Sequence, residues 1–466
     1  MKKFVLLSVG MFFALASRAG WVYDPGAKTI TDGTWVLNVN VVDDGLQLGD
    51  GSNGGAINSG NAGSGDLDLR EVYADTGYRV VSIRDNAFKG VSVVSSLVAP
   101  DVVQIKANAF YSCKLTNIVV SADISAVGNF AFCSSKLQDI TPRTFKIAAV
   151  PGSMFESCSS LQGDLSFPDA TVVSAGAFKS TSAIGTIQFS ERVTTIDAEA
   201  FRGSAVANIL PLYMPNLVTL GDNCFYGAAN LVGDFVWPKV TSIRGFRSAR
   251  KVTSVVATNA LIVGSACFRD CSALTNVQYS ANATNIMGNC FYGCGNLESV
   301  GAYLPDTLQA FGGGFYSCSK LAMKLRIASP YITNLPGECF RGSASAFVGD
   351  VDIYSPLTTI GARAFQSSKA GQVYNFYAKS APANVDFTAF NASGGNGGGR
   401  LGAYLKVYCQ SALAGWQALC AITDESELAS LPGYPGDKAV GAVNSSGYYH
   451  WVIDCTPPSG TLITVM

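Results

Sequence analysis

One pattern of apolar and polar positions returns every 21 to 25 residues along about 300 residues of this chain. Each copy ends in a phenylalanine, which a small residue precedes in every copy except at Met154, and most copies have an aliphatic side chain five places earlier, as Ile105 precedes Phe110. A fixed period of this length predicts a solenoid, in which each turn buries its apolar side against its neighbours. The repeating phenylalanines are Phe88, Phe110, Phe132, Phe155, Phe178, Phe201, Phe225, Phe246, Phe268, Phe291, Phe315, Phe340, Phe365 and Phe390.

A polar turn follows each phenylalanine and leads into a segment such as LTNIVV at 115–120 or LTNVQY at 274–279. Apolar residues at the first, fourth and sixth places can point inward if the middle of the segment is a short strand. The two residues that flank the fourth place then face solvent. We therefore expect a β-rich repeat solenoid of about 14 turns with short parallel strands and a cap at each end.

Five segments are expected along the chain. Residues 1–19 have two lysines, an apolar run of 13 residues and small residues near the end, as in a secretory signal peptide. That run is too short for a comfortable membrane span, so we expect no span in the mature chain. The other segments are a β cap at 20–79, the solenoid at 80–390, a C-terminal cap of a strand and a short helix at 391–430, and a β-hairpin tail at 431–466, turned at 457–460.

Two stretches carry a family resemblance, FYSCKLTNI at 110–118 and CFRDCSALTNV at 267–277. They resemble the BspA-like leucine-rich repeats of secreted and surface bacterial proteins, in which the unit ends in Ile-Gly-x-x-Ala-Phe and continues into Cys-x-x-Leu-x-x-Ile. The resemblance implies a leucine-rich repeat array and a secreted or cell-surface protein that binds other molecules. It implies no catalytic residue.

The low charge of the chain limits the classes of partner that it can bind. The formal net charge is −1 and only 14% of residues are charged, so no basic surface for nucleic acid or an anionic membrane is indicated. We expect an extracellular protein or glycan as the partner, and no nucleic acid. No pattern indicates an oligomeric state.

The 13 cysteines favour a structural interpretation. Some stand directly before the phenylalanine and others three places after it, where other copies have alanine, so we expect small buried hydrophobes that are mostly unpaired. A disulfide between stacked neighbours such as Cys294 and Cys318 stays open. No cofactor or metal is expected, because the cysteine pairs have no histidine near them.

Catalysis is not expected. The chain has one histidine, His450, and no Gly-x-Ser-x-Gly elbow that would accompany a serine nucleophile. Asp350 and Asp352 could share a strand face at glycosidase separation, but a solvated charged pair explains them more simply. His450 lies in the aromatic run YYHW at 448–451, which either packs the tail or stacks a sugar.

The expected function is therefore non-enzymatic binding of a protein or glycan, outside the cell or at its surface. The alternatives are an envelope scaffold and, less favoured, a carboxylate-dependent glycoside hydrolase. The outward strand positions are the expected ligand-binding surface, because they act together along a continuous face. Asn276, Gln278, Lys324 and Arg326 are the first to test, since two neutral groups are expected near two cations. The full set is Asn117, Asp139, Thr186, Gln188, Asn276, Gln278, Lys324, Arg326, Asp350 and Asp352.

Overall fold

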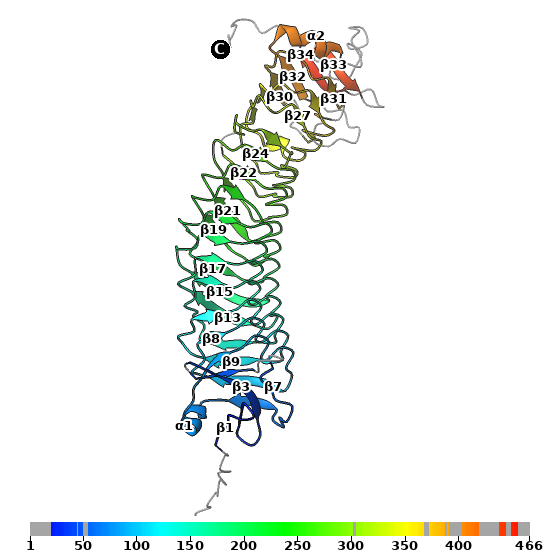
Figure 1. Cartoon of the computed structure of the whole chain (residues 1–466). Helices are drawn as coiled ribbons and strands as arrows, with labels where there is room; N and C mark the ends of the chain where they lie inside the picture. Colours follow the sequence, from blue (N-terminus) through cyan, green and yellow to red (C-terminus); the bar gives the residue numbers. More distant parts are fainter. Residues whose placement is uncertain are drawn as a thin grey trace, which may run out of the picture.

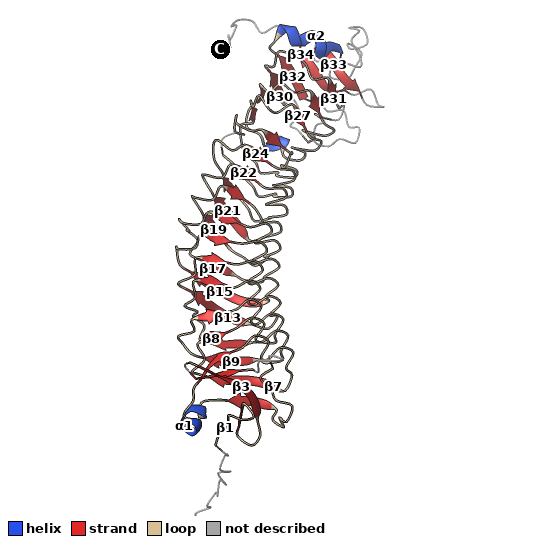
Figure 2. Cartoon of the chain, viewed as in Figure 1, coloured by secondary structure: helices blue, strands red, loops and turns tan. Residues whose placement is uncertain are grey.

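The computed structural model describes residues 20–43, 45–49, 55–301, 304–367, 372–386, 389–390, 403–418, 438–443 and 449–454. The expected signal peptide, 1–19, lies outside these residues. The described chain forms a long curved rod with the first strands at one end and α2 (Gln410–Ala418) at the other (Figure 1). Strands dominate, with α1 (Val72–Thr76) near the first end (Figure 2). The β-rich solenoid predicted from the sequence is confirmed.

Four antiparallel strands begin the rod: β1 (Val22–Asp24), β2 (Thr29–Thr31), β3 (Val36–Val42) and β4 (Gly45–Leu48). The last of them pairs in parallel with β6 (Val80–Ile83), the first short strand of the repeats. The N-terminal strands therefore cover the backbone edge that the first turn would otherwise leave unpaired.

Most turns contribute one strand to the long-strand face, which is divided into four sheets whose strands are parallel except for the pair β33–β34. The first contains β5 (Gly65–Asp68), β7 (Val94–Ala99), β9 (Asn117–Val120) and β11 (Asp139–Thr141); the second, β13 (Gln162–Phe167), β15 (Ala183–Phe189) and β17 (Asn208–Leu210); the third, β19 (Gly233–Val236), β21 (Val252–Val256) and β23 (Asn276–Gln278). The fourth contains β26 (Arg326–Ile327), β28 (Val351–Ile353), β30 (Val373–Phe376), β32 (Ala403–Val407), β34 (Tyr449–Asp454) and β33 (Lys438–Val443).

Short strands, of two residues each except for the four-residue β6, form a second column of parallel pairs. In most copies their second residue is the aliphatic side chain five places before the phenylalanine, as Ile105 is in β8. In the copy that ends at Phe315, Phe311 takes this buried place instead, so that turn is shifted by one residue. The short strands are β6, β8 (Gln104–Ile105), β10 (Ala126–Val127), β12 (Ala149–Val150), β14 (Val172–Val173), β16 (Thr195–Ile196), β18 (Thr219–Leu220), β20 (Ser242–Ile243), β22 (Ile262–Val263), β24 (Asn285–Ile286), β25 (Ala310–Phe311), β27 (Asn334–Leu335), β29 (Thr359–Ile360) and β31 (Asn384–Val385).

The fourteen repeating phenylalanines form one unbroken stack along the core. Successive ring centroids are 4.9 to 5.9 Å apart, and successive planes lie within 28° of parallel. All fourteen rings are buried. They bound about 13 full turns, in agreement with the predicted array of about 14.

A third set of hydrogen bonds holds the phenylalanine segments together. The Phe110 amide donates to the Ala131 carbonyl at 2.7 Å, and the Ser112 amide donates to the Cys133 carbonyl at 2.9 Å. The backbone reaches this arrangement through left-handed residues on either side of the ring, with φ of 55° at Asn108 and 53° at Ser112. Glycine and asparagine tolerate this conformation best, which explains why they recur at these places, where serine is also frequent.

The cysteines have a second role beyond that of small hydrophobes. The eleven described cysteines are free, and ten of them are buried. Four of those that lie three places after a phenylalanine, Cys158, Cys271, Cys294 and Cys318, donate their S–H to the phenylalanine carbonyl of the preceding turn, as Cys271 does to Phe246 at 3.0 Å and Cys294 to Phe268 at 2.9 Å. The prediction of buried, unpaired cysteines is confirmed for these residues, and the S–H bond is a contribution that the sequence did not indicate. Ser343 donates in the same way to Phe315.

The last strands include a hairpin of β33 and β34, which pair antiparallel. Its chain reversal falls between residues 443 and 449, where the sequence is NSSGY, so the predicted turn at 457–460 is wrong. Residues 457–460 lie outside the described part of the chain. The Pro-Pro-Ser-Gly sequence there was a stronger local turn signal than Asn-Ser-Ser-Gly, but pairing with β32 fixes β34 earlier. Within the described residues, no helix is both long and apolar enough to cross a membrane.

Replacing Phe201 with alanine should lower the free energy of unfolding by about 3 to 5 kcal/mol, the usual cost of removing a buried ring. Phe201 packs between Phe178 and Phe225, with centroid separations of 5.2 and 5.4 Å. Equilibrium urea unfolding would measure the change, with Phe201→Leu as the matched control that keeps most of the buried volume. A loss below about 1 kcal/mol for the alanine variant would show that the stack does not hold the core.

Alkaline pH should destabilise the fold through the buried thiols. Burial raises the pKa of Cys113 to about 11 and that of Cys158 and Cys267 to about 12, from an ordinary value of 9.0. Above about pH 9 the unfolded chain therefore binds fewer protons than the folded chain, and the free energy of unfolding falls as pH rises towards the folded pKa. The urea midpoint should drop between about pH 8 and pH 10.

The matched variant for this effect is Cys158→Ser with Cys267→Ala, which keeps a donor at the first position and the residue of other copies at the second. Its urea midpoint should fall less steeply over the same pH interval. Equal slopes for the two proteins would show that the thiols do not contribute.

Candidate functional site

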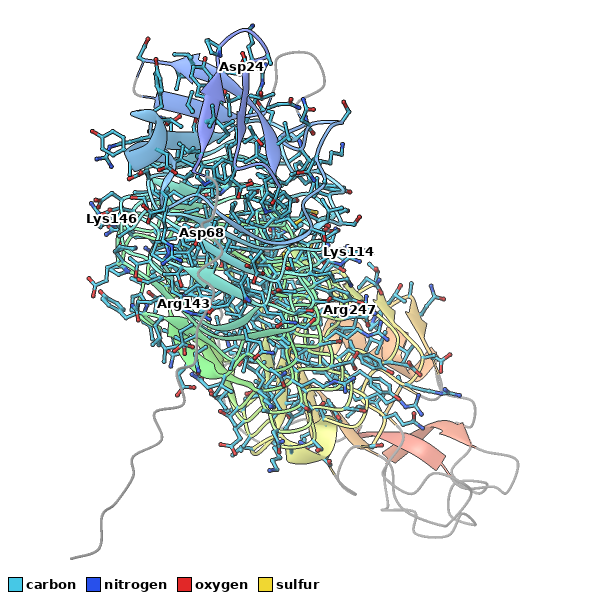
Figure 3. The ribbon with its side chains drawn as sticks, turned by 90° about the horizontal axis from the view of Figure 1, so that it is seen from below. Asp24, Asp68, Lys114, Arg143, Lys146 and Arg247 are labelled. Carbon is cyan, nitrogen blue, oxygen red and sulfur yellow. The ribbon has the colours of Figure 1, made fainter. Side chains whose placement is uncertain are left out.

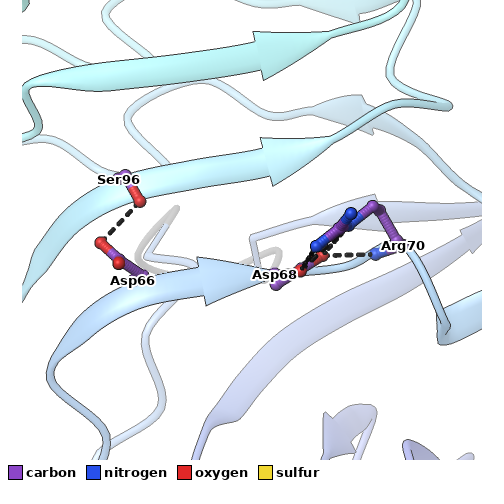
Figure 4. A network of polar contacts seen from close by, with 4 residues as sticks. All are labelled: Asp66, Asp68, Arg70 and Ser96. Atoms are coloured by element: carbon purple, nitrogen blue, oxygen red, sulfur yellow. Dashed lines mark hydrogen bonds and ion pairs between the residues drawn. The ribbon is translucent and has the colours of Figure 1, made fainter.

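The outward side chains of the long-strand face begin at β5, where Asp66 and Asp68 both point to solvent. The Asp66 carboxylate accepts hydrogen bonds from Ser96 Oγ at 2.6 Å and from Ser95 Oγ at 3.0 Å, and Asp68 pairs with Arg70 (Figure 4). The Ser96 and Ser95 hydroxyls lower the pKa of Asp66 from its ordinary value. Cross-strand polar contacts of this kind recur farther along the face.

The residues predicted as ligand-binding all lie on this face. Each is exposed or half-buried, because strand alternation turns its neighbours inward. Parallel register aligns some of them in columns, as Asn117 opposite Asp139 and Thr186 opposite Asn208. These positions are Asn117, Asp139, Thr186, Gln188, Asn276, Gln278, Lys324, Arg326, Asp350 and Asp352.

The structure does not place the first four test residues in one sheet. Asn276 and Gln278 lie on β23, at the end of the third sheet, and Asn276 Nδ2 donates to Ser254 Oγ at 3.2 Å. Lys324 precedes β26 and Arg326 begins it, in the fourth sheet. The neutral pair and the cationic pair therefore belong to separate parts of the face.

Four of the predicted residues do come together in the fourth sheet. Lys324 Nζ lies 3.6 Å from Asp352 Oδ2, and Arg326 stands opposite Asp352 in the parallel register. Asn375 on β30 joins the two aspartates, since its Nδ2 lies 2.8 Å from Asp352 Oδ1 and 3.4 Å from Asp350 Oδ2. Arg326 also pairs with Asp306.

Three stacked tyrosines stand beside these charges. The centroids of Tyr354 and Tyr377 are 4.3 Å apart and those of Tyr377 and Tyr408 are 4.6 Å apart, with planes 7° and 15° from parallel. The Arg326 guanidinium lies 5.1 Å from the Tyr354 centroid. Burial, and next the charge of Asp352, raise the pKa of Tyr377 well above its ordinary value. Tyr354 and Tyr408 are nevertheless 36% and 39% exposed.

We call this group the C-terminal cluster. It combines two cations, two carboxylates, one amide and a rigid aromatic stack on one sheet. Its members are Lys324, Arg326, Asp350, Asp352, Tyr354, Asn375, Tyr377 and Tyr408.

The three tyrosines and Asn375 were not among the binding residues predicted from the sequence, although the sequence carries a signal for them. Three segments share the order inward residue, polar residue, inward residue, tyrosine: VDIY at 351–354, YNFY at 374–377 and LKVY at 405–408. The predicted outward positions were only the two residues beside each central apolar position, so the tyrosine one place farther along was not among them. Alignment of these three segments would have extended the outward face by one column.

No group of three or more histidine, cysteine, aspartate or glutamate side chains in the described residues could hold a metal ion. The arrangement offers hydrogen bonds, charge pairs and aromatic edges, which are the means of non-covalent recognition.

Comparison with known proteins gives a family match. The model of the BspA type leucine-rich repeat region matches in six copies, over residues 81–207, 151–256 and 241–372. These ranges contain most of the phenylalanine stack. No curated protein sequence is significantly similar to the chain.

Several solved structures are also similar to the chain. A leucine-rich cell surface protein from Faecalibacterium prausnitzii A2-165 is 20% identical, with 70% of this chain and 94% of that chain covered and a TM-score of 0.43. The pneumococcal vaccine antigen PcpA is 14% identical, with 77% and 94% covered and a TM-score of 0.44. A leucine-rich repeat protein from Bacteroides ovatus ATCC 8483 is 18% identical, with 73% and 92% covered and a TM-score of 0.37.

Proposed function

The chain belongs to the BspA-type leucine-rich repeat family, and from that premise we propose that it is a non-enzymatic binding protein of the cell surface or the medium. Its partner is an extracellular protein, contacted through the C-terminal cluster of the long-strand face. The single observation that carries this proposal is the stack of Tyr354, Tyr377 and Tyr408 beside Arg326.

The composition of the cluster favours protein recognition. Tyrosine and arginine are enriched among the residues that contribute most to protein interfaces. The stack holds its rings in place before a partner arrives, so little side-chain entropy is lost on binding. Lys324 and Asp350 are exposed beside it and fit the polar rim of an interface.

The ring geometry favours a protein over a glycan at this cluster. A sugar ring binds an aromatic side chain by lying on its face. Here Tyr377 is covered on both faces by its neighbours, and one face of Tyr354 lies against Arg326. The stack presents mainly ring edges and hydroxyl groups, which suit the hydrogen-bonding groups of a protein surface.

The carboxylates also support binding over hydrolysis. A glycoside hydrolase needs one carboxyl group to protonate the leaving group and a second to act as base or nucleophile. Asp350 and Asp352 instead both accept from the one side-chain amide of Asn375, and Asp352 also faces Lys324. These contacts make the two carboxylates part of a surface network.

Replacing Tyr354 and Tyr377 together with alanine should weaken protein binding by at least about 30-fold, the effect of losing one strong interface residue or more. The full chain would be tested on an array of extracellular proteins and glycans, and its strongest ligand would be titrated by biolayer interferometry. The matched control is Tyr292→Ala with Tyr316→Ala, another tyrosine pair stacked at 4.5 Å. This control should keep the affinity within about twofold.

A second pair of variants separates the parts of the face. Lys324→Ala with Arg326→Ala should weaken the same interaction, whereas Asn276→Ala with Gln278→Ala should leave it unchanged. The proposal is wrong if only glycans bind, or if the Tyr354 and Tyr377 variant binds as the unmodified chain does. Co-purification with one fixed envelope partner through another surface would support the scaffold instead.

A further inference from the structure

A second ordered surface follows the residue directly after each repeating phenylalanine. Over seven consecutive turns this residue is arginine or tyrosine, and we call the set the arginine–tyrosine column: Arg202, Tyr226, Arg247, Arg269, Tyr292, Tyr316 and Arg341. The column does not lie on the long strands. Figure 3 shows Arg247 on one side of the ribbon and Arg143, next to β11, on the other.

Backbone hydrogen bonds between neighbouring turns place the residues of the column one above the other, and we call each such position a rung. The Arg247 carbonyl accepts from the Gly227 amide and the Arg269 carbonyl from the Ser248 amide, both at 2.8 Å. The phenylalanines of the seven turns are 4.9 to 5.6 Å apart, which sets the spacing of the rungs. The column is thus a regular surface built on the core stack.

The side chains of the column stack on one another. Arg202 and Arg247 each lie 5.3 Å from the centroid of Tyr226, one from each neighbouring turn. Arg269 lies 4.7 Å from the centroid of Tyr292. Tyr292 stacks on Tyr316, and Arg341 lies 5.3 Å from the centroid of Tyr316. A stacked guanidinium keeps its N–H edge available for a carboxylate or sulfate.

Charge is balanced at the ends of the column. Arg202 pairs with Glu199 at 2.5 Å, and Arg341 pairs with Glu338 at 2.6 Å. Each terminal cation therefore has a carboxylate of its own.

Charge is not balanced in the middle. In the part of the chain that the structure describes, Arg247 has no carboxylate within 4.0 Å, and Arg269 reaches only Asp270, through Nε at 3.5 Å. The Nε atoms of both arginines are buried without a hydrogen-bond partner. Two like charges on adjacent rungs repel one another. A bound oxyanion would relieve that repulsion and supply acceptors to both guanidinium groups.

The same turn carries further positive charge. The segment RGFRSARK at 244–251 contains four cations and no acid. Arg244 pairs with Asp222 at 2.8 Å, Lys251 donates to Asn230, and Arg250 is exposed. The turn that carries Arg247 is therefore locally rich in positive charge, on a chain whose formal net charge is −1.

We propose that the arginine–tyrosine column binds an acidic polysaccharide, with Arg247 and Arg269 together holding one carboxylate or sulfate group. The rungs repeat at 4.9 to 5.6 Å, close to the length of one sugar unit in an extended chain. An acidic peptide strand fits less well, since residues on one side of a strand recur at about 6.6 Å. The tyrosine hydroxyls between the cations can bond to sugar hydroxyls.

The test uses the full chain with heparin and polygalacturonate as the sulfated and carboxylated probes, and dextran as the neutral one. The unmodified chain should bind at least one acidic probe, more weakly as salt is added, and should not bind dextran. Arg247→Gln with Arg269→Gln should weaken this binding at least about tenfold, since two charge-assisted hydrogen-bonding groups are lost. The control, Arg143→Gln with Arg192→Gln, removes the same charge elsewhere and should stay within about twofold.

Binding of neither acidic polysaccharide overturns the proposal, as does an equal loss in both double variants, which would indicate general charge attraction. Binding of polyglutamate in place of the polysaccharides would make the partner an acidic protein and also overturns it. Urea midpoints would confirm that both variants are folded. Tyr354→Ala with Tyr377→Ala should leave polysaccharide binding unchanged. Failure of the polysaccharide proposal can therefore be distinguished from failure of the proposed protein binding.

A third double variant tests whether the flat guanidinium group is required in addition to the positive charge. Arg247→Lys with Arg269→Lys keeps both charges but loses the stacked planes and the paired N–H edges. This variant should lose most of the affinity that the glutamine variant loses. Affinity equal to that of the unmodified chain would show that a stacked guanidinium pair is not the recognition element.

Discussion

The stacking of one phenylalanine on the next is the interaction on which the rest of this structure depends. For one ring to stack on the next, the chain must complete each turn about 5 Å farther along the solenoid axis, and this condition sets the rise of every turn. The left-handed residues on both sides of each ring, such as Asn108 and Ser112, make the return possible. The buried thiols then donate hydrogen bonds to the phenylalanine carbonyls inside the solenoid. Strand register follows from that spacing.

The sequence predicted those parts of the fold that the core controls. Inward positions such as Ile105 and Phe110 recur in most turns, because a change there leaves a cavity or a clash, and so the solenoid, its parallel strands and the outward positions could be predicted. The hairpin turn was misplaced, because pairing of β34 with β32 outweighed a local Pro-Gly signal. The donor role of Cys271 was not visible, since alanine is tolerated at the same place in other turns.

The surface was harder to predict for a physical reason. Outward positions are free to vary, so the repeat is weaker there and extends over only a few turns, as in VDIY, YNFY and LKVY. Strand alternation predicted Lys324, Arg326, Asp350 and Asp352 as outward residues, but the contacts of Asn375 with both aspartates depend on side-chain positions that the pattern does not give. Fold and binding surface are thus separate properties of the same repeat, in line with the general independence of fold and function.

The free thiols impose a condition on how this protein is made. Disulfides form readily in oxidising compartments, and ten of the eleven free cysteines that the structure describes are buried in the finished solenoid. An unfolded chain in such a compartment would expose these thiols, and they would stay free there only if folding outpaced oxidation. A solenoid can fold quickly, because each turn contacts only its neighbours and can therefore form locally. In such a compartment the regular core would also protect the thiols from oxidation during folding, because each sulfur is buried when the next turn packs over it.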